Sequence, residues 1–424
     1  MHLAALNLPE LIIPLLRGTF ECDKLDDKAT WDWVVLIEET WSIHGETVAN
    51  SRPYLPGCFD RPPRNPAEKI SSGYKAKEYL TYVYGLLPAL LRTILPEKYW
   101  RHFCKLVFAI RLLHKRSITA TEVALVHKML VEYENEFEEL YYQRLPSRLH
   151  FCRPCVHTLG HLASEVSRLG PLIYYTQWTM ERTIGNLGEE IKQPSRPYAN
   201  LSQRGLRRSQ VNALKVMVPL LAEEESRSNI SNLTCNLGDG YHLLHAREKE
   251  ARRVDSTVEA DAIRCYMSEA GLLLQDRSAA WHPVIARWAR LRLPNAQIVR
   301  SAWKEIAVMD IENTRMSRNI KAHTGNNHGS ALAMVSLYSE PDAAILQSSY
   351  NTVWMCKYHR DNALKVVDVK NIAAVVAMVP EPGPDGRMPE GAGRLTVGHQ
   401  YFVVEKTGLD VSYLGGVEDP IDDE

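Results

Sequence analysis

The sequence predicts an α+β protein with a mainly α-helical N-terminal half and a small, mainly β C-terminal domain. Over roughly the first 220 residues, apolar side chains recur every three or four positions, the spacing of amphipathic helices. From about residue 283, β-branched runs are separated by turn-forming residues. A chain of 424 residues is long enough for two or three domains with sizeable cores. Its composition, 45% hydrophobic and 24% charged, is that of an ordinary globular protein.

Residues 1–66 are predicted to hold an N-terminal helical segment and a proline-rich loop. The stretch TWDWVVLIEETWSIHG, residues 30–45, has apolar residues at helical spacing and is predicted to be a helix. Residues 51–66 contain five prolines, which neither a helix interior nor a central strand accommodates. They are therefore predicted to form a loop.

Residues 67–221 are predicted to form a helical domain. Apolar and aromatic residues follow helical spacing from Tyr74 onward, and Pro96 is placed to open the helix EKYWRHFCKLVFAIRLLHK, where its missing N–H costs nothing. Thr119 and Glu122 form a capping-box pattern at the start of a third helix. We expect these three helices to pack as an antiparallel bundle.

The remainder of the chain is predicted to change from linker to sheet. Residues 222–282 are predicted to be a linker and a helix, because residues 222–256 are polar with charges of both signs. Residues 283–415 are predicted to be the β-rich domain, with a hairpin in ARLRLPNAQIVRSAW and strands in NTVWMCKYH, ALKVVDVKNIAAVVAMV and HQYFVVEKTG. Residues 416–424 are predicted to be an acidic tail.

Composition and missing motifs exclude several classes of protein. The net charge of -1 provides no overall field toward nucleic acid or anionic lipid, so any basic surface is local. Eight unevenly spaced cysteines, and an N-terminus without the pattern of a signal peptide, predict an intracellular protein that is not secreted. No apolar run is long enough to cross a bilayer, so we expect no membrane insertion. Phosphate-binding glycine loops are absent, so we expect no nucleotide cofactor.

One carboxylate stands out in YTQWTMERTIGNLGEEI, residues 175–191. Glu181 is followed on its helix face by Gly185 and Gly188, and glycines beside an acid leave room for a metal, a phosphate or another backbone. Glu181 is thus either a solvated surface acid or a metal-binding catalytic residue. A neighbouring stripe of apolar residues predicts that this helix packs against something: Met180, Ile184, Leu187 and Ile191.

A second candidate site is the stretch HFCRPCVHTLGH, which gathers cysteines and histidines. Two cysteines separated by two residues and two histidines four apart are typical of zinc ligands, although one intervening residue is a short link between the pairs. The alternative is a helix start with buried cysteines and hydrogen-bonded histidines. The residues are His150, Cys152, Cys155, His157 and His161.

Two basic segments are candidates for DNA binding, because arginines neutralise phosphates and indoles stack on bases. The alternative is an ordinary solvated face with tryptophans in the core. The first segment contains Arg182, Lys192, Arg196, Arg204, Arg207, Arg208 and Lys215. The second contains Arg287, Arg290, Arg292, Arg300 and Lys304, interleaved with Trp288 and Trp303.

Long strings of the chain resemble one family. The run FCRPCVHTLGHLASEVSRLGPLIYYTQWTMERTIGNLGEEIKQPSRPYANLSQRG, with YLPGCFDRPPRNPAEKISSGYKAKEYL, LRLPNAQIVRSAWKE and YFVVEKTGLDVSYLGG, resembles the later part of fungal CACTA (En/Spm-type) DNA transposases. The resemblance implies that Glu181 is the last acid of an RNase H-like DDE core, on a helix that follows an all-helical insertion. It also implies two Mg²⁺ ions, DNA transposon ends as partners and a nuclear location.

The chain departs from that family in two places. Its Met1-His2 stands where the family has an Asp-x-Met-His element with the second acid, and the stretch KAHTGNNHGSALAM is shorter than the family norm. We therefore expect a transposase fragment that is inactive alone, lacks both catalytic aspartates and holds no cofactor by itself. The alternative is a non-catalytic DNA- or protein-binding module.

Three expectations follow for the structure. No aspartate should approach Glu181 closely enough to share a metal; Asp23, Asp26, Asp27 and Asp32 are expected to be turn and capping residues. The cysteines and histidines of the HFCRPCVHTLGH stretch should not converge on one metal. The apolar stripe beside Glu181 should pack on the helix near MHLAALNLPELIIPLL, or the protein should self-associate.

Overall fold

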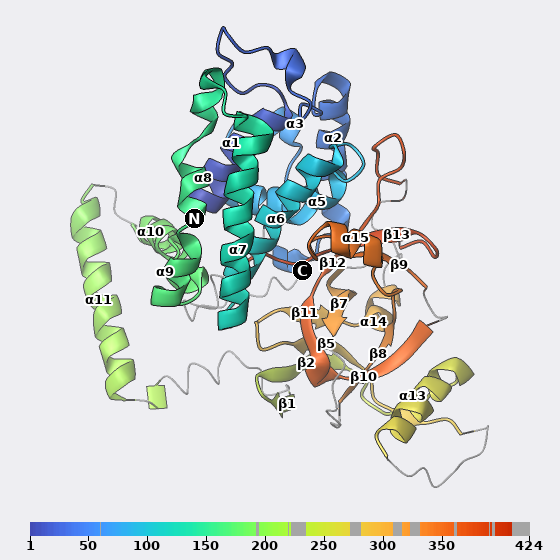
Figure 1. Cartoon of the computed structure of the whole chain (residues 1–424). Coiled ribbons are helices and arrows are strands. Elements are labelled where there is room, and N and C mark those ends of the chain that lie inside the picture. Colours follow the sequence, from blue (N-terminus) through green and yellow to red (C-terminus); the bar gives the residue numbers. More distant parts are fainter. Residues whose placement is uncertain are drawn as a thin grey trace.

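A computed structural model gives the fold, and it is α+β (Figure 1). The structure describes residues 1–59, 61–191, 195–218, 220–221, 235–271, 281–307, 316–322, 331–359, 363–389, 391 and 395–408. The side chains of Thr179, Arg182 and His245 also lie outside the description. The predicted acidic tail and most of the predicted linker therefore fall outside the described residues.

Helices make up the described N-terminal half. Three π-helical turns, at Leu3–Asn7, Tyr82–Leu86 and Glu138–Tyr142, adjoin α-helices. The α-helices are α1 (Leu8–Leu16), α2 (Glu38–Asn50), α3 (Pro66–Lys69), α4 (Ala76–Thr81), α5 (Leu87–Leu90), α6 (Glu97–Leu113), α7 (Ala120–Phe137), α8 (Pro154–Leu159), α9 (Leu162–Leu169), α10 (Trp178–Glu190) and α11 (Pro197–Met217).

The start of α7 confirms the predicted capping box. The Thr119 hydroxyl accepts a hydrogen bond from the Glu122 N–H at 3.2 Å, and the Glu122 carboxylate accepts one from the Thr119 N–H at 2.8 Å. Two orphan donors at the helix start are thereby satisfied. Helix α6 begins after Pro96, its N-cap, and packs along α7 with α1 against the same core.

The predicted helix over residues 30–45 is wrong in its first half, because α2 begins only at Glu38. Trp31 and Trp33 lie in irregular backbone, are 3% and 0% exposed, and stack with ring centroids 5.5 Å apart. Their rings pack edge-on against Phe151, at 5.3 Å and 6.4 Å. Burial of large aromatic side chains against a distant segment thus overrides the local helical spacing.

The C-terminal part contains short antiparallel sheets. Its strands are β1 (Cys235–Gly238), β2 (Tyr241–Arg247), β3 (Arg252–Arg253), β4 (Val284–Ile285), β5 (Trp288–Arg292), β6 (Ile298–Arg300), β7 (Ile320–Ala322), β8 (Leu332–Ser336), β9 (Met355–Lys357), β10 (Leu364–Asp368), β11 (Ile372–Val375), β12 (Ala377–Pro380) and β13 (Gln400–Val404). The helices α13 (Thr257–Glu269), α14 (Ala302–Ile306) and α15 (Ala343–Ser348) lie between them.

The β5–β6 hairpin confirms the pattern predicted around the Pro-Asn turn, with Arg290 opposite Arg300. It belongs to a four-stranded sheet in the order β1-β2-β5-β6. Two further pairs, β10 with β8 and β11 with β7, and a three-stranded sheet β12-β13-β9 complete the main pairings. The prediction of a linker is wrong for β1, β2 and β3, because β1 pairs with β2, β2 with the later strand β5, and β3 with the later strand β4.

The helical part shares one buried cluster with strands of the β-rich part, and three further clusters lie within the β-rich part itself. Phe402 and Val404 of β13 are buried in the same cluster as α1, α6 and α7. The half-buried Arg111 of α6 donates hydrogen bonds to the Tyr84 carbonyl at 2.7 Å and the Thr352 carbonyl at 2.6 Å. Val404 of β13 packs directly against the backbone at Gly85. A Cβ at that position would lie 2.9 Å from a methyl of Val404, so a glycine is needed there. Among the described helices, none combines the length and apolar composition needed to cross a membrane.

Candidate functional site

Glu181 is exposed on α10, which falls within the helix predicted over residues 175–191 but begins three residues later, at Trp178. A Cβ added to Gly185 or to Gly188 would meet no atom within 4 Å, so nothing described approaches this face. Among the described residues, no group of three or more His, Cys, Asp and Glu side chains is arranged to hold a metal ion. At this position the described residues therefore provide the Glu181 carboxylate and an open surface, and they do not form a two-metal site.

The apolar stripe of α10 is largely uncovered. Met180 is 54% exposed and Ile184 is 61% exposed, while Leu187 and Ile191 are half-buried. The expectation that this stripe packs on the N-terminal helix is wrong, because α1 is itself buried against α6 and α7 and is not available to cover α10. Self-association stays a prediction.

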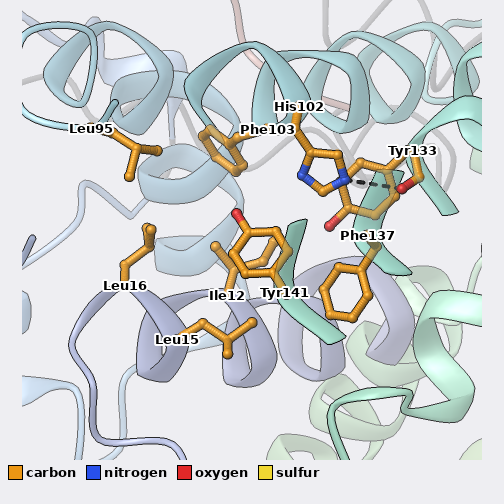
Figure 2. A pocket seen from close by; sticks show the side chains of 9 residues that line it. All are labelled: Ile12, Leu15, Leu16, Leu95, His102, Phe103, Tyr133, Phe137 and Tyr141. Carbon is orange, nitrogen blue, oxygen red and sulfur yellow. Dashed lines mark hydrogen bonds between the residues drawn. The ribbon is translucent and has the colours of Figure 1, made fainter. Parts of the chain in front are cut away.

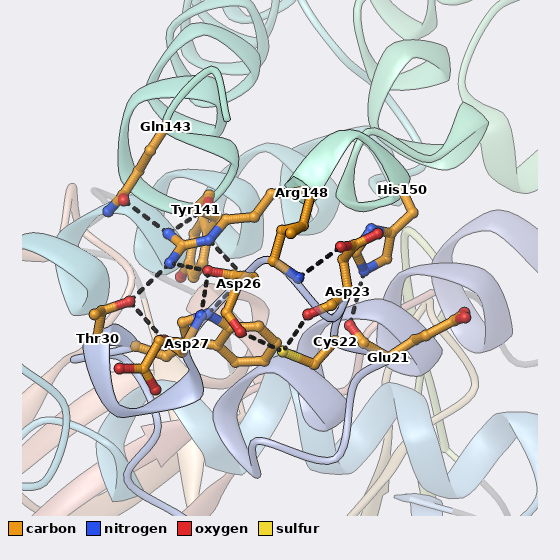
Figure 3. Close-up of polar contacts among 12 residues, drawn as sticks. Glu21, Cys22, Asp23, Asp26, Asp27, Thr30, Tyr141, Gln143, Arg148 and His150 are labelled. Carbon is orange, nitrogen blue, oxygen red and sulfur yellow. Dashed lines mark hydrogen bonds and ion pairs between the residues drawn. The ribbon is translucent and has the colours of Figure 1, made fainter. Parts of the chain in front are cut away.

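The carboxylates of Asp23, Asp26, Asp27 and Asp32 all form hydrogen bonds with other residues. The first three belong to the network of Figure 3. The Asp23 carboxylate accepts from the Leu25 N–H at 2.8 Å, and that of Asp27 from the Ala29 N–H at 2.9 Å, as expected for turn and capping residues. Asp32 instead accepts a hydrogen bond from the Tyr99 hydroxyl and pairs with Lys98 at 2.8 Å.

Asp26 lies in the predicted turn, with its N–H donating to the Asp23 carbonyl at 3.0 Å, and its carboxylate also forms a buried ion pair. Both its oxygens accept from the Arg148 guanidinium at 2.8 Å, and the two side chains are 4% and 2% exposed (Figure 3). Arg148 also donates to Gln143 at 2.7 Å and to Thr30 at 2.9 Å. These hydrogen bonds hold the pKa of Asp26 below its usual value. The pair joins the irregular segment after α1 to the segment before α8.

The cysteines of the HFCRPCVHTLGH stretch are not poised as metal ligands. Cys155 is buried and its thiol points toward the Asn7 carbonyl, with sulfur and oxygen 3.9 Å apart, while Cys152 is exposed. Burial raises the pKa of both thiols, which disfavours the thiolate that zinc requires. His150 is held by the Glu21 carbonyl at 2.7 Å.

The two remaining histidines of that stretch do come together. His157 Nε2 and His161 Nε2 are 3.1 Å apart, and the Glu134 carboxylate lies 3.3 Å from His157 Nδ1. Sequence reasoning paired the histidines by their spacing but missed Glu134. The available signal was Gly160, since its lack of a side chain leaves room for Glu134.

The first basic segment lies on α11, at the left edge of Figure 1. Helix α11 packs against α10, contains four basic residues and no acid, and has no buried residue. Arg204 and Arg207 are exposed, and Arg208 pairs with Glu190 of α10. Arg196 is the N-cap residue of α11. Lys192 and the side chain of Arg182 lie outside the described residues.

The second basic segment covers one face of the four-stranded sheet. Ala289 and Leu291 of β5 are buried, so alternation along the strand places Arg290 and Arg292 on the opposite face. Arg300 of β6 lies directly across from Arg290 on that same face. The structure thus brings three of the four predicted arginines together.

The edges of this arginine face carry tryptophans and two acids, one of which, Glu305, lies 3.9 Å from the Arg300 guanidinium. The Arg247 guanidinium lies 5.2 Å from the Trp288 ring centroid, and that of Arg287 lies 4.8 Å from the Trp303 centroid. Arg287 also pairs with Glu248 at 2.7 Å, so its charge is locally balanced. On the face itself, burial and then the positive charge of Arg292 lower the pKa of His242, which lies opposite that arginine.

A small cavity between α1, α6 and α7 does not offer a substrate site (Figure 2). Its volume is about 10 Å³, room for a single water, and its walls are apolar and aromatic apart from His102. The His102 ring stacks on Tyr133 at 4.0 Å and is hydrogen-bonded to the Tyr133 carbonyl at 2.9 Å. The cavity is therefore part of the core.

Comparison with known proteins does not identify the chain: no protein-family model, no curated protein and no solved structure matches it.

Proposed function

We propose that this chain is a DNA-binding, catalytically incomplete part of a CACTA-type transposase, and that the β5–β6 face carries the DNA contact. The observation that supports DNA binding is the juxtaposition of Arg290, Arg292 and Arg300 on one sheet face. Like charges directly opposite one another destabilise an antiparallel pair. Glu305 balances part of the Arg300 charge. Each arginine that neutralises a phosphate also releases a condensed counterion, which favours binding.

The spacing of the three arginines along and across the strands suits the sugar–phosphate backbone more than a small anion. Three arginines on adjacent strands are spaced by the strand separation of about 5 Å and the two-residue repeat of about 7 Å, close to the phosphate spacing along one DNA strand. Trp288 on the same face offers an indole for stacking. We expect sequence-independent binding, since contacts to phosphate carry no base information.

The transposase part of the proposal rests on the sequence resemblance and on Glu181. In a DDE enzyme, three carboxylates hold two Mg²⁺ ions. The described residues do not fit such a pair by themselves, because no second carboxylate joins Glu181 in a metal-holding group. The RNase H-like core, the two partner aspartates, the Mg²⁺ requirement and the nuclear location are thus proposed for the complete machinery, and cleavage is not assigned to this chain alone.

Binding of a duplex as a function of salt tests the DNA contact. The probe is a fluorescein-labelled random duplex of about 30 base pairs, and anisotropy is recorded between about 50 and 200 mM KCl. In the Arg290→Gln/Arg300→Gln double variant, we expect weaker binding and a slope of log K against log salt that is smaller by about 2. The matched control is Arg144→Gln, an arginine whose side chain is 75% exposed and lies outside both basic segments.

Two outcomes would contradict the proposal. If the double variant and the control bind alike, the sheet face does not contact DNA. If only Arg204→Gln/Arg207→Gln on α11 weakens binding, DNA is held by the helix and the assignment to the sheet is wrong. Incubation of the full chain with transposon-end DNA and Mg²⁺ should leave the DNA intact, and strand cleavage that Glu181→Gln abolishes would refute catalytic incompleteness.

A protein-binding module is the second candidate, favoured by the uncovered apolar residues of α10 and α11. Leu206 and Met217 of α11 are 60% and 78% exposed, close to one another in angle around the helix. A second copy of the chain is one such partner. In that case, a double substitution Leu206→Ser/Met217→Ser abolishes association in light scattering and leaves DNA binding unchanged.

A further inference from the structure

The junction of α8 and α9 brings together three polar side chains that the proposed DNA contact does not use. His157 lies in α8, His161 is the N-cap residue of α9, and Glu134 comes from the last turn of α7. The His157 side chain is 75% exposed and that of Glu134 is 30% exposed. The group is therefore open to solvent on one side and supported by α7 on the other.

The separation of the two imidazole nitrogens matches a shared metal ion. His157 Nε2 and His161 Nε2 are 3.1 Å apart. Two Zn–N bonds of about 2.0–2.1 Å place their nitrogens about 3.3–3.4 Å apart in tetrahedral geometry, and about 2.9 Å apart at a right angle. The observed distance lies between these values, so one ion reaches both nitrogens without movement of the backbone.

The orientation of the rings agrees with this. The ring centroids are 4.8 Å apart and the ring planes meet at 85°. An N–H···N hydrogen bond lying along the axes of both rings would put the centroids about 5.4 Å apart at this nitrogen separation. The shorter centroid distance means that at least one ring axis is tilted away from the line that joins the two nitrogens. Such a tilt is expected when both nitrogen lone pairs point toward one ion beside that line.

Glu134 sets the tautomer that metal binding needs. Its carboxylate lies 3.3 Å from His157 Nδ1, so the Nδ1–H donates to it and Nε2 keeps its lone pair. Metal-bound histidines commonly donate their second N–H to a carboxylate in this way. Gly160 makes the approach possible, because a Cβ at that position would lie 3.0 Å from a Glu134 carboxylate oxygen.

We propose that His157 and His161 chelate one Zn²⁺ through their Nε2 atoms, with Glu134 as the positioning residue and water in the remaining coordination positions. Imidazole suits zinc and copper, whereas Mg²⁺ prefers oxygen ligands, so this site is distinct from any magnesium site. The cysteines of the same stretch take no part. Bound zinc joins α8 to α9 across Gly160 and strengthens their attachment to α7.

Titration of the untagged full chain with Zn²⁺, followed by calorimetry, tests the site. We expect one equivalent of bound Zn²⁺ that is lost in both His157→Ala and His161→Ala. Glu134→Gln should weaken binding by about 10–100-fold, the usual effect of removing a carboxylate behind a metal-bound histidine. Because all three side chains reach solvent, the variants should fold, and thermal unfolding followed by circular dichroism verifies this.

Electron paramagnetic resonance of bound Cu²⁺ counts the ligands directly. Hyperfine coupling should report two imidazole nitrogens in the wild type and one in each single histidine variant. The matched controls are His150→Ala and Cys152→Ser, which lie in the same stretch and should change neither readout. If Cys152→Ser removes the bound metal, a cysteine site replaces this one. If the histidine variants bind Zn²⁺ as the wild type does, the pair is only a hydrogen bond and the proposal fails.

Discussion

Helices α6 and α11 are both long and amphipathic, yet they differ in what covers them. Helix α6 has 17 residues, of which eleven are buried, including the polar His102 and Lys105. Helix α11 has 21 residues and none is buried. An apolar stripe therefore predicts a helix but not what surrounds it. Helix α6 lies between α1, α7 and the β-rich part, whereas the main contact of α11 among the described elements is with α10. Stability should therefore be concentrated in the part of the fold that contains α6.

The largest effect is expected from buried charge in the well-packed region. Arg148→Met leaves the Asp26 carboxylate buried without its partner, and we expect the free energy of unfolding to fall by about 3–5 kcal/mol. Arg208→Met, which breaks the exposed pair with Glu190 between α10 and α11, should lower it by at most about 1 kcal/mol. Urea denaturation measures both.

A double-mutant cycle shows whether the buried charge of Asp26 causes this loss of stability. If Asp26→Asn is introduced into Arg148→Met, part of the lost stability should return, because the buried uncompensated charge is removed. If Arg148→Met and Arg208→Met lower the free energy of unfolding equally, stability is not concentrated in the region that contains α6.

A matched pair of leucine truncations is expected to give the next effect. Leu106 in α6 is fully buried, so Leu106→Ala should lower the free energy of unfolding by about 2–5 kcal/mol through lost burial and a residual cavity. Leu214 in α11 is 51% exposed, and Leu214→Ala should change it by no more than about 0.5 kcal/mol. A large loss from Leu214→Ala at high protein concentration, absent on dilution, would instead indicate that self-association covers α11.

The smallest effect concerns pH and His102. Burial, and then the charge of Lys105, lower the pKa of His102 to about 3 from an ordinary value near 6.5. Between these values the unfolded chain binds the proton and the folded protein does not, so stability is complete above about pH 6.5 and falls as the pH drops toward 3. From pH 7 to pH 5 the loss due to His102 should be about 2 kcal/mol.

His102→Gln tests that assignment, because glutamine can donate to the Tyr133 carbonyl but does not titrate. The difference in unfolding free energy between pH 7 and pH 5, from urea denaturation, should shrink by about the same 2 kcal/mol. The matched control is His150→Gln, whose backbone partner is Glu21 and which should keep the pH dependence of the wild type. An unchanged difference in His102→Gln would show that His102 is not the group that titrates.

Local patterns were sufficient to predict several elements of this protein. The Thr119–Glu122 capping box and the β5–β6 turn depend on residues close in sequence, and the structure has them where expected. A helix also lies within residues 175–191, as predicted. Alternation along β5 likewise determines that Arg290 and Arg292 share a face. Such features follow from backbone geometry and short-range hydrogen bonds, which a sequence specifies directly.

Other features were decided only by the tertiary structure. Trp31 and Trp33 lie outside the helix that their spacing predicts and pack against Phe151, and β2 forms within the predicted linker because β5 pairs with it. Asp26 meets Arg148 across 122 residues, and Glu134 meets His157 across 23. The free energy of these contacts comes from burial and from charge pairing between distant segments, so it depends on which surfaces meet. Local spacing specifies that a helix such as α10 or α11 has an apolar side, and only the packed fold determines whether that side is covered.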